Sequence, residues 1–229
     1  MSKKHQVEDE DINIGEAYSK AEKFLDEKKQ PIGIALGAII VIILGTFYYF
    51  NMYLPPLQKN AQVDVFQAQK AFENDSFDLA MYGNGDFMGF EEVIENYGST
   101  AIGNTSKYYM AVSLLHTGAY EDAIDYFNSY SPEDHITKSL KEGGIGDCLS
   151  QMGDYEGAIA AYEKAAKAYV NDFSTPLYLK KAGITAEKIN DFDAAVKYYE
   201  QISTDYPDSQ EGRDRKSTRL NSVTWPSRM

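Results

Sequence analysis

Few residues in this 229-residue chain can support covalent or metal chemistry. It contains one cysteine, one tryptophan and three histidines. A lone cysteine excludes an internal disulfide, and Cys148 lies too far from the N-terminus to be the lipidated cysteine of a processed lipoprotein. The surrounding pattern places Cys148 on an apolar helix face, which predicts a buried free thiol rather than a reactive one.

The reactive groups that an enzyme needs do not converge in this sequence. His5 is separated from His116 and His135 by a long apolar run, and no HExxH, CxxC or glycine-rich phosphate loop is present. The glycines of GGIG (143–146) fall inside a predicted helix, where close helix packing accounts for them. We therefore predict no enzymatic activity, no catalytic or metal-binding residue, no cofactor and no small-molecule substrate.

Basic residues are also scarce. Lys and Arg number 22 against 35 Asp and Glu, which gives a net charge of −13. The imbalance is concentrated in residues 56–212, which hold 11 basic and 26 acidic groups. An acidic block of this size repels phosphate backbones and anionic head groups, so nucleic acid is excluded as a partner. A solvated acidic surface and a surface for basic protein partners are both compatible with it.

No charged residue lies between Lys29 and Lys59. Within this gap, the 23 residues 32–54 are mostly apolar, and as a helix they would extend about 34 Å, enough to cross a bilayer. Aromatic residues gather at the C-terminal end, as in the interfacial belt of a membrane helix. The sequence predicts a transmembrane helix over 31–55, which the Pro55–Pro56 pair should stop or kink. A cleaved signal peptide is disfavoured, because its apolar core is shorter and ends at small residues.

The flanking cations predict the orientation of this helix. Four lysines precede it closely, whereas Lys59 is the one lysine that follows it closely. Under the positive-inside rule, residues 1–30 form a cytoplasmic leader and the chain after Pro56 lies outside, which in a bacterium is the periplasm. The expected location is the bacterial inner membrane, with a single pass. Apolar residues at helical spacing in 13–29 predict a short amphipathic helix in the leader.

Three segments downstream of this run share one pattern. They read TGAYEDAIDYFNSY (117–130), MGDYEGAIAAYEKA (152–165) and INDFDAAVKYYEQI (189–202). Each has a turn residue, an aromatic, an alanine and a closing aromatic, in that order. The turn residues are Gly118, Gly153 and Asn190, which are 35 and 37 residues apart. The alanines and closing aromatics are Ala123, Phe127, Ala158, Tyr162, Ala195 and Tyr199.

The demands of a helix hairpin explain these residue types. Glycine and asparagine tolerate the left-handed backbone of a turn between antiparallel helices. Alanine lets two helix axes approach closely, and the aromatics fill the groove between neighbouring hairpins. One hairpin cannot bury its apolar face alone, so the hairpins must stack. The predicted fold is all-α: an N-terminal transmembrane helix followed by an α-solenoid of antiparallel helix pairs.

These features resemble the tetratricopeptide repeat (TPR) family. The resemblance covers three repeats in 104–212, with further matching positions at Gly146, Gly183 and Pro207. The early tryptophan of the family pattern is absent from all three repeats.

Residues 56–103 precede the three repeats and are expected to be a linker with capping helices and a degenerate repeat. Helices are expected over 57–74 and 87–97, and the stretch 75–86 between them should be irregular.

In the TPR family the first helix of each pair lines a concave surface. The resemblance places there eight candidate protein-binding residues: Tyr108, Val112, His116, Asp147, Gln151, Lys180, Ile184 and Glu187. One known use of the fold clamps a C-terminal carboxylate with lysine and asparagine. Tyr108 and Val112 occupy the corresponding positions of the first repeat, so that mode of recognition is not expected here. A plain solvent-exposed surface is the alternative.

The layout is also similar to that of the ancillary SecYEG translocon subunit family, which has a cytoplasmic helix, one span and a periplasmic repeat domain. This resemblance implies a helper that contacts newly exported chains near the translocon. Our leading hypothesis is a membrane-anchored protein–protein interaction module, a scaffold or chaperone-like helper for exported proteins at the outer face of the inner membrane. A structural subunit of a fixed envelope complex and an accessory domain of an enzyme are the alternatives.

The C-terminal segment 213–229 differs in composition from the acidic repeats that precede it. It is polar and aperiodic, with five basic residues and one acidic residue. The stretch RKSTRLNS resembles translated adapter or vector sequence, so we expect an artefactual C-terminus. A disordered basic tail is the alternative.

Overall fold

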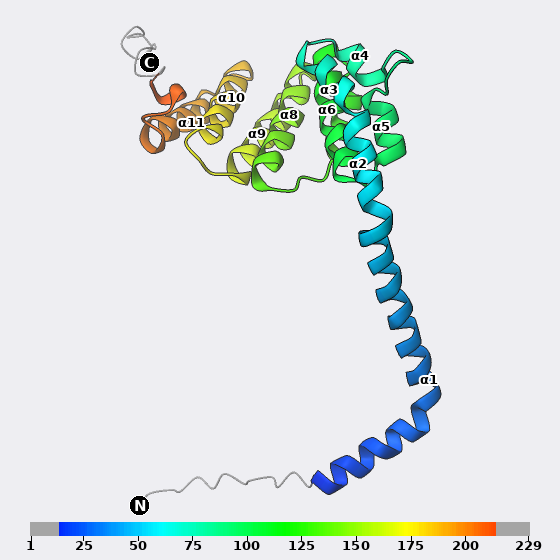
Figure 1. Cartoon of the computed structure of the whole chain (residues 1–229). Helices are drawn as coiled ribbons and strands as arrows, with labels where there is room; N and C mark the ends of the chain where they lie inside the picture. The colour runs from blue at the N-terminus through cyan, green and yellow to red at the C-terminus, as the bar shows by residue number, and fades with distance from the viewer. Residues whose placement is uncertain (1–13, 214–229) are drawn as a thin grey trace, which may run out of the picture. The chain divides into compact units, whose positions relative to one another are not determined.

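The computed structural model describes residues 14–213, which are helical and contain no β-strand. The chain divides into two compact units, Met1–Pro56 and Leu57–Met229. The start of the predicted leader and the tail after Arg213 lie outside the described residues. Figure 1 shows the run of helices in each unit. Helical structure without strands over residues 14–213 agrees with the all-α fold that the repeat pattern predicted.

The N-terminal unit is dominated by one helix, α1 (Ile14–Tyr48). The helix expected in the leader and the expected membrane helix are therefore continuous rather than separate elements. α1 bends along its length (Figure 1). Pro31 lies inside it and removes one backbone hydrogen bond, which is a common cause of a helix bend.

The apolar part of this helical run is exposed. By length and composition it could cross a membrane, and no part of its most apolar stretch is buried inside the protein. It is the one such helix in the described part of the chain. Side chains such as Ile34, Val41 and Leu44 are more than half exposed, so the fold itself provides no apolar surroundings for them.

Of the two outcomes expected at Pro55 and Pro56, a stop or a kink, the stop is contradicted, because the helical run goes on through both prolines. A π-helical turn, Tyr49–Tyr53, precedes them, and the N–H of Leu54 donates to the carbonyl of Tyr49. The next helix, α2 (Leu54–Asp64), starts immediately afterwards. Both prolines therefore occupy the first turn of a new α-helical segment, where a missing N–H is tolerated.

Three short helices follow: α3 (Phe66–Glu73), α4 (Phe77–Tyr82) and α5 (Phe90–Tyr97). α4 corrects the prediction that 75–86 is irregular throughout. Its apolar residues pack inward: Ala80 and Met81 are buried, and the ring of Phe77 lies 5.7 Å from that of Phe72. Tertiary packing thus makes a helix of a segment whose sequence is rich in turn formers.

Three helix hairpins complete the Leu57–Met229 unit, which we call the repeat unit. They are α6 (Ala101–Thr117) with α7 (Tyr120–Ser129), α8 (His135–Met152) with α9 (Tyr155–Ala168), and α10 (Ser174–Lys188) with α11 (Phe192–Asp205). The expected left-handed turns are found at Gly118, Gly153 and Asn190, whose φ angles are 88°, 86° and 61°. Pro207 follows the end of α11 in a turn.

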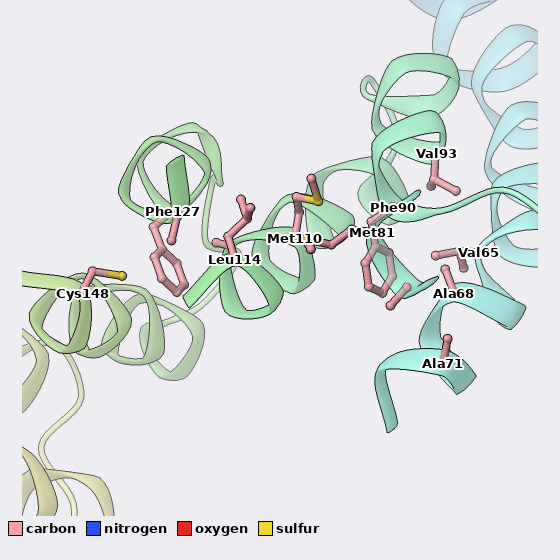
Figure 2. Packing of buried hydrophobic residues seen from close by; sticks show 13 residues of the cluster. Val65, Ala68, Ala71, Met81, Phe90, Val93, Met110, Leu114, Phe127 and Cys148 are labelled. Atoms are coloured by element: carbon pink, nitrogen blue, oxygen red, sulfur yellow. The ribbon is translucent and has the colours of Figure 1, made fainter. Parts of the chain in front are cut away.

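The repeat unit has two buried clusters. The first extends from Val65, between α2 and α3, to Cys148 of α8 (Figure 2). The second is built from α9, α10 and α11. The expected hairpin alanines and closing aromatics are all buried in these clusters: Ala123, Phe127, Ala158, Tyr162, Ala195 and Tyr199.

Cys148 is a free thiol with none of its surface exposed, as the sequence predicted. Burial raises the pKa of the thiol to about 12, because the charged thiolate is poorly solvated there. The side chain therefore acts as a small apolar core residue.

Glycines let α8 pack against aromatic rings from three other helices. A Cβ at Gly143 would lie 2.2 Å from the ring of Tyr178, and one at Gly144 would lie 2.3 Å from that of Phe127. At Gly146 the corresponding distance to the ring of Tyr162 is 2.6 Å, and Gly183 of α10 meets Tyr199 in the same way at 2.7 Å. Close packing thus accounts for the GGIG motif.

Candidate functional site

Three of the predicted concave-face residues meet in one groove. His116 near the end of α6 and Asp147 and Gln151 of α8 line a hollow of about 340 Å³. We call this hollow the α6–α8 groove; its remaining lining residues are Leu115, Tyr120, Ser150 and Tyr162. The other predicted residues, Tyr108, Val112, Lys180, Ile184 and Glu187, do not line it.

A network of polar contacts fixes Asp147 in the floor of this groove. The hydroxyl of Tyr162 donates to Oδ1 of Asp147 at 2.7 Å. Nζ of Lys181 donates to Oδ1 and Oδ2 at 2.7 and 2.8 Å. Burial, followed by the nearby Asp147 charge, raises the pKa of Tyr162 well above its ordinary value, so the phenol remains protonated and donates.

Lys181 was missed by the sequence reasoning, which selected Lys180. One signal could have found it: Lys181 is 34 residues after Asp147, close to one repeat length, and carries the opposite charge. Its ammonium also lies 5.7 Å from the ring centroid of Tyr162 and 6.0 Å from that of Tyr178. Lys181 therefore neutralises the one carboxylate among the residues that line the groove.

His116 and Gln151 present hydrogen-bonding groups at the surface of the groove. The imidazole of His116 stacks on the ring of Phe77 from α4, with centroids 4.5 Å apart and planes 6° apart. Both His116 and Gln151 are exposed, and within residues 14–213 neither side chain makes a hydrogen bond. The α6–α8 groove thus offers exposed hydrogen-bonding groups beside a carboxylate whose charge is compensated by Lys181.

The side chain of Tyr108 is half-buried and packs against other aromatic rings. Its ring lies 5.8 Å from that of Phe127 and 5.5 Å from that of Tyr130. Burial raises the pKa of its phenol to about 12, with a further contribution from Tyr130. Ile184 and Glu187 of α10 are exposed, and Val112 and Lys180 are half-buried.

The described residues contain no group of three or more His, Cys, Asp or Glu side chains that could hold a metal ion. In the α6–α8 groove, the hydrogen-bonding groups of His116 and Gln151 lie next to Leu115 and two tyrosines, a combination suited to the amide backbone and mixed side chains of a polypeptide.

Comparison with known proteins agrees with this geometry. Residues 143–169 and 180–209 match models described as tetratricopeptide repeats, and these segments fall on the α8–α9 and α10–α11 hairpins. The chain therefore carries TPR repeats, a class associated with protein–protein interaction. The α6–α7 hairpin lies outside the two matched segments.

Two curated relatives are similar over more than half of the chain. One is a TPR repeat-containing protein of Methanocaldococcus jannaschii, 28% identical over 61% of this chain and 25% of the relative. The other is the low calcium response locus protein H of Yersinia pseudotuberculosis, 23% identical over 53% of this chain and 72% of the relative. The chain thus spans a quarter of the first relative's length.

Proposed function

We propose that this chain is a membrane-anchored TPR protein whose α6–α8 groove binds segments of other proteins. The observation that carries the proposal is the convergence of His116, Asp147 and Gln151 in one groove of the repeat unit. The carboxylate is compensated by Lys181, whereas His116 and Gln151 retain free hydrogen-bonding capacity. Such a surface favours polypeptide over nucleic acid, in keeping with the acidic charge of the unit.

The anchor is the apolar part of α1, continued through the π-helical turn. Two features support it: the exposure of its apolar side chains and its sufficient length. The lysines that precede the run favour a cytoplasmic N-terminus and a repeat unit on the outer side of the membrane. In a bacterium this unit would meet newly exported chains, and we propose these as the proteins bound.

Groove variants test the binding. His116→Ala and Gln151→Ala alter exposed side chains and should leave the fold intact, as should the control Lys197→Ala on α11. Proteins co-purified with the full chain from membranes are compared quantitatively for the three variants and the parent. Loss of the same set of proteins from both groove variants, with retention in the control, is the expected result. Equal recovery from all variants contradicts the proposal.

The recovered set also separates the functional classes. Many exported proteins in substoichiometric amounts fit a helper for exported chains. One stoichiometric partner, unaffected by the groove variants, would instead make the chain a structural subunit. Turnover of any substrate by the purified chain would revive an enzymatic role.

Orientation is tested separately in spheroplasts. Protease added from outside should digest the repeat unit, with a tag placed before residue 1 remaining protected. Protection of the repeat unit until lysis would place it in the cytoplasm, and the role with exported chains would then be wrong.

A further inference from the structure

The connection between α9 and α10 displays two apolar side chains to solvent. Phe173 is 83% exposed, the largest value for any large apolar residue in the described part of the chain, and Val170 is 69% exposed. Single apolar side chains are often exposed on protein surfaces, so the position of this connection in the fold decides what these two side chains can contact.

Hydrogen bonds fix this connection in one conformation. Oδ1 of Asn171 accepts from the N–H groups of Phe173 and Ser174, both at 2.8 Å. The N–H of Asn171 donates to Oγ1 of Thr175 at 3.0 Å. The exposure of Phe173 is therefore built into the loop, which points its ring away from the core.

The α9–α10 connection lies on the edge of the repeat unit that also contains Gln58 of α2 and the start of α6. At this edge the N–H of Ala101, the first residue of α6, donates to the side chain of Gln58 at 3.1 Å. Asn104 in the next turn of α6 exchanges hydrogen bonds with the backbone of Ser131, in the α7–α8 connection, at 2.7 and 3.0 Å. The α7–α8 and α9–α10 connections run along one edge in Figure 1.

Gln58 is also close in sequence to the apolar run. It is four positions after Leu54, so even a fully extended chain could span only about 14 Å between them. If residues 32–54 lie in a bilayer, the edge that contains Gln58 starts within reach of the lipid head groups. No comparable constraint acts on the opposite edge, which carries Gly118, Gly153 and Asn190.

We infer that this edge of the repeat unit rests on the lipid interface and that Phe173 and Val170 insert into it. Phenylalanine and valine are suited to the boundary between head groups and acyl chains. Asp172 lies between them in sequence and is exposed, which favours a zwitterionic surface over an anionic one. The inference rests on the proposed anchor.

A spin label tests this contact in the full chain, reconstituted into phosphatidylcholine nanodiscs. The label is placed at Val170→Cys. Met152→Cys, at the opposite edge, is the matched control, since this side chain is also exposed. Ile40→Cys reports on the anchor. Cys148 is fully buried, and the parent chain measures any labelling of it.

Collision with oxygen, which concentrates in lipid, is compared with collision with a water-soluble nickel complex. We expect a several-fold higher oxygen-to-nickel ratio at 170 than at 152. Phe173→Ser should lower the ratio at 170 towards that at 152, and Phe173→Leu should preserve it.

Three other results would overturn the inference. Equal ratios at 170 and 152, with a high ratio at 40, would show that the anchor spans the bilayer and that the edge stays in water. Low collision with both reagents at 170 would indicate a covering protein instead of lipid. A water-like ratio at 40 would contradict the anchor itself, and the inference would fall with the proposed anchoring.

Discussion

Lys181 of α10 donates to both carboxylate oxygens of Asp147 of α8, at 2.7 and 2.8 Å. The pair joins the first helices of two successive hairpins beneath the α6–α8 groove. The two side chains keep 34% and 32% of their surface exposed, so solvent screens part of their attraction. Tyr162 adds a third contact to the same carboxylate.

Breaking this pair should destabilise the repeat unit modestly. Lys181→Met is expected to lower the free energy of unfolding by about 1 kcal/mol, because the bidentate contact is lost while Asp147 keeps its bond from Tyr162. Urea unfolding of the detergent-solubilised chain, followed by circular dichroism, measures the change. In a double-mutant cycle with Asp147→Asn, the two losses should be less than additive. Fully additive losses would mean that the two side chains do not interact in solution.

Adding a methyl group to α8 at Gly144 should destabilise the repeat unit. A Cβ at Gly144 would lie 2.3 Å from the ring of Phe127, which is fully buried. We expect Gly144→Ala to lower the free energy of unfolding by about 1–3 kcal/mol through overpacking. Phe127→Leu creates room at the same place, so the double variant should be more stable than the sum of the single effects predicts. Simple additivity would contradict this packing.

Glu163 should contribute to stability in a pH-dependent way. The hydroxyl of Tyr198 donates to its Oε1 at 2.6 Å and Lys167 donates to its Oε2 at 3.0 Å. These two bonds, with Tyr198 the larger cause, lower the pKa of Glu163. Since the folded-state pKa is depressed, the stabilisation is present above the unfolded-state pKa and is lost as the pH falls through the folded-state value.

The comparison of Glu163→Gln with the parent chain tests this linkage. The variant should be less stable at neutral pH and should lose less stability than the parent between pH 5 and pH 3, a range that spans roughly the ordinary pKa of a glutamate. The measurement is urea unfolding at several pH values in that range. Parallel pH profiles for the two proteins would show that Glu163 contributes no such linkage.

Cys148 should be inert until the repeat unit unfolds. Its thiol is fully buried and burial raises its pKa to about 12, so both access and thiolate formation are suppressed. A thiol reagent such as DTNB is expected to react with the native chain at pH 8 far more slowly than with the urea-unfolded chain. Rapid reaction under native conditions would place Cys148 at the surface.

The local pattern predicted the hairpins because their residue types are dictated by backbone geometry. A turn with positive φ selects glycine or asparagine, and Gly118, Gly153 and Asn190 adopt such angles. The buried alanines and aromatics followed from the same spacing. These features depend on contacts within one hairpin or between neighbours, so sequence periodicity records them.

Features that depend on longer-range packing were harder to predict. α4 forms because Ala80 and Met81 are buried against other helices, which outweighs the turn-forming residues around them. The helix continues past Pro55 because a π-helical turn shifts the hydrogen-bond register. Lys181, rather than Lys180, reaches Asp147 because the rotation of α10 about its axis decides which lysine faces α8.

Photocrosslinking in living cells tests the central claim most directly. A photoreactive amino acid is placed at Gln151 in the α6–α8 groove, or at exposed Lys197 of α11 as the control. Our account predicts adducts with exported proteins at Gln151, few at Lys197, and digestion of the Gln151 adducts by protease added to spheroplasts. Equal adduct formation at the two positions, or Gln151 adducts with cytoplasmic proteins that resist external protease, would contradict a protein-binding groove at the outer face of the membrane.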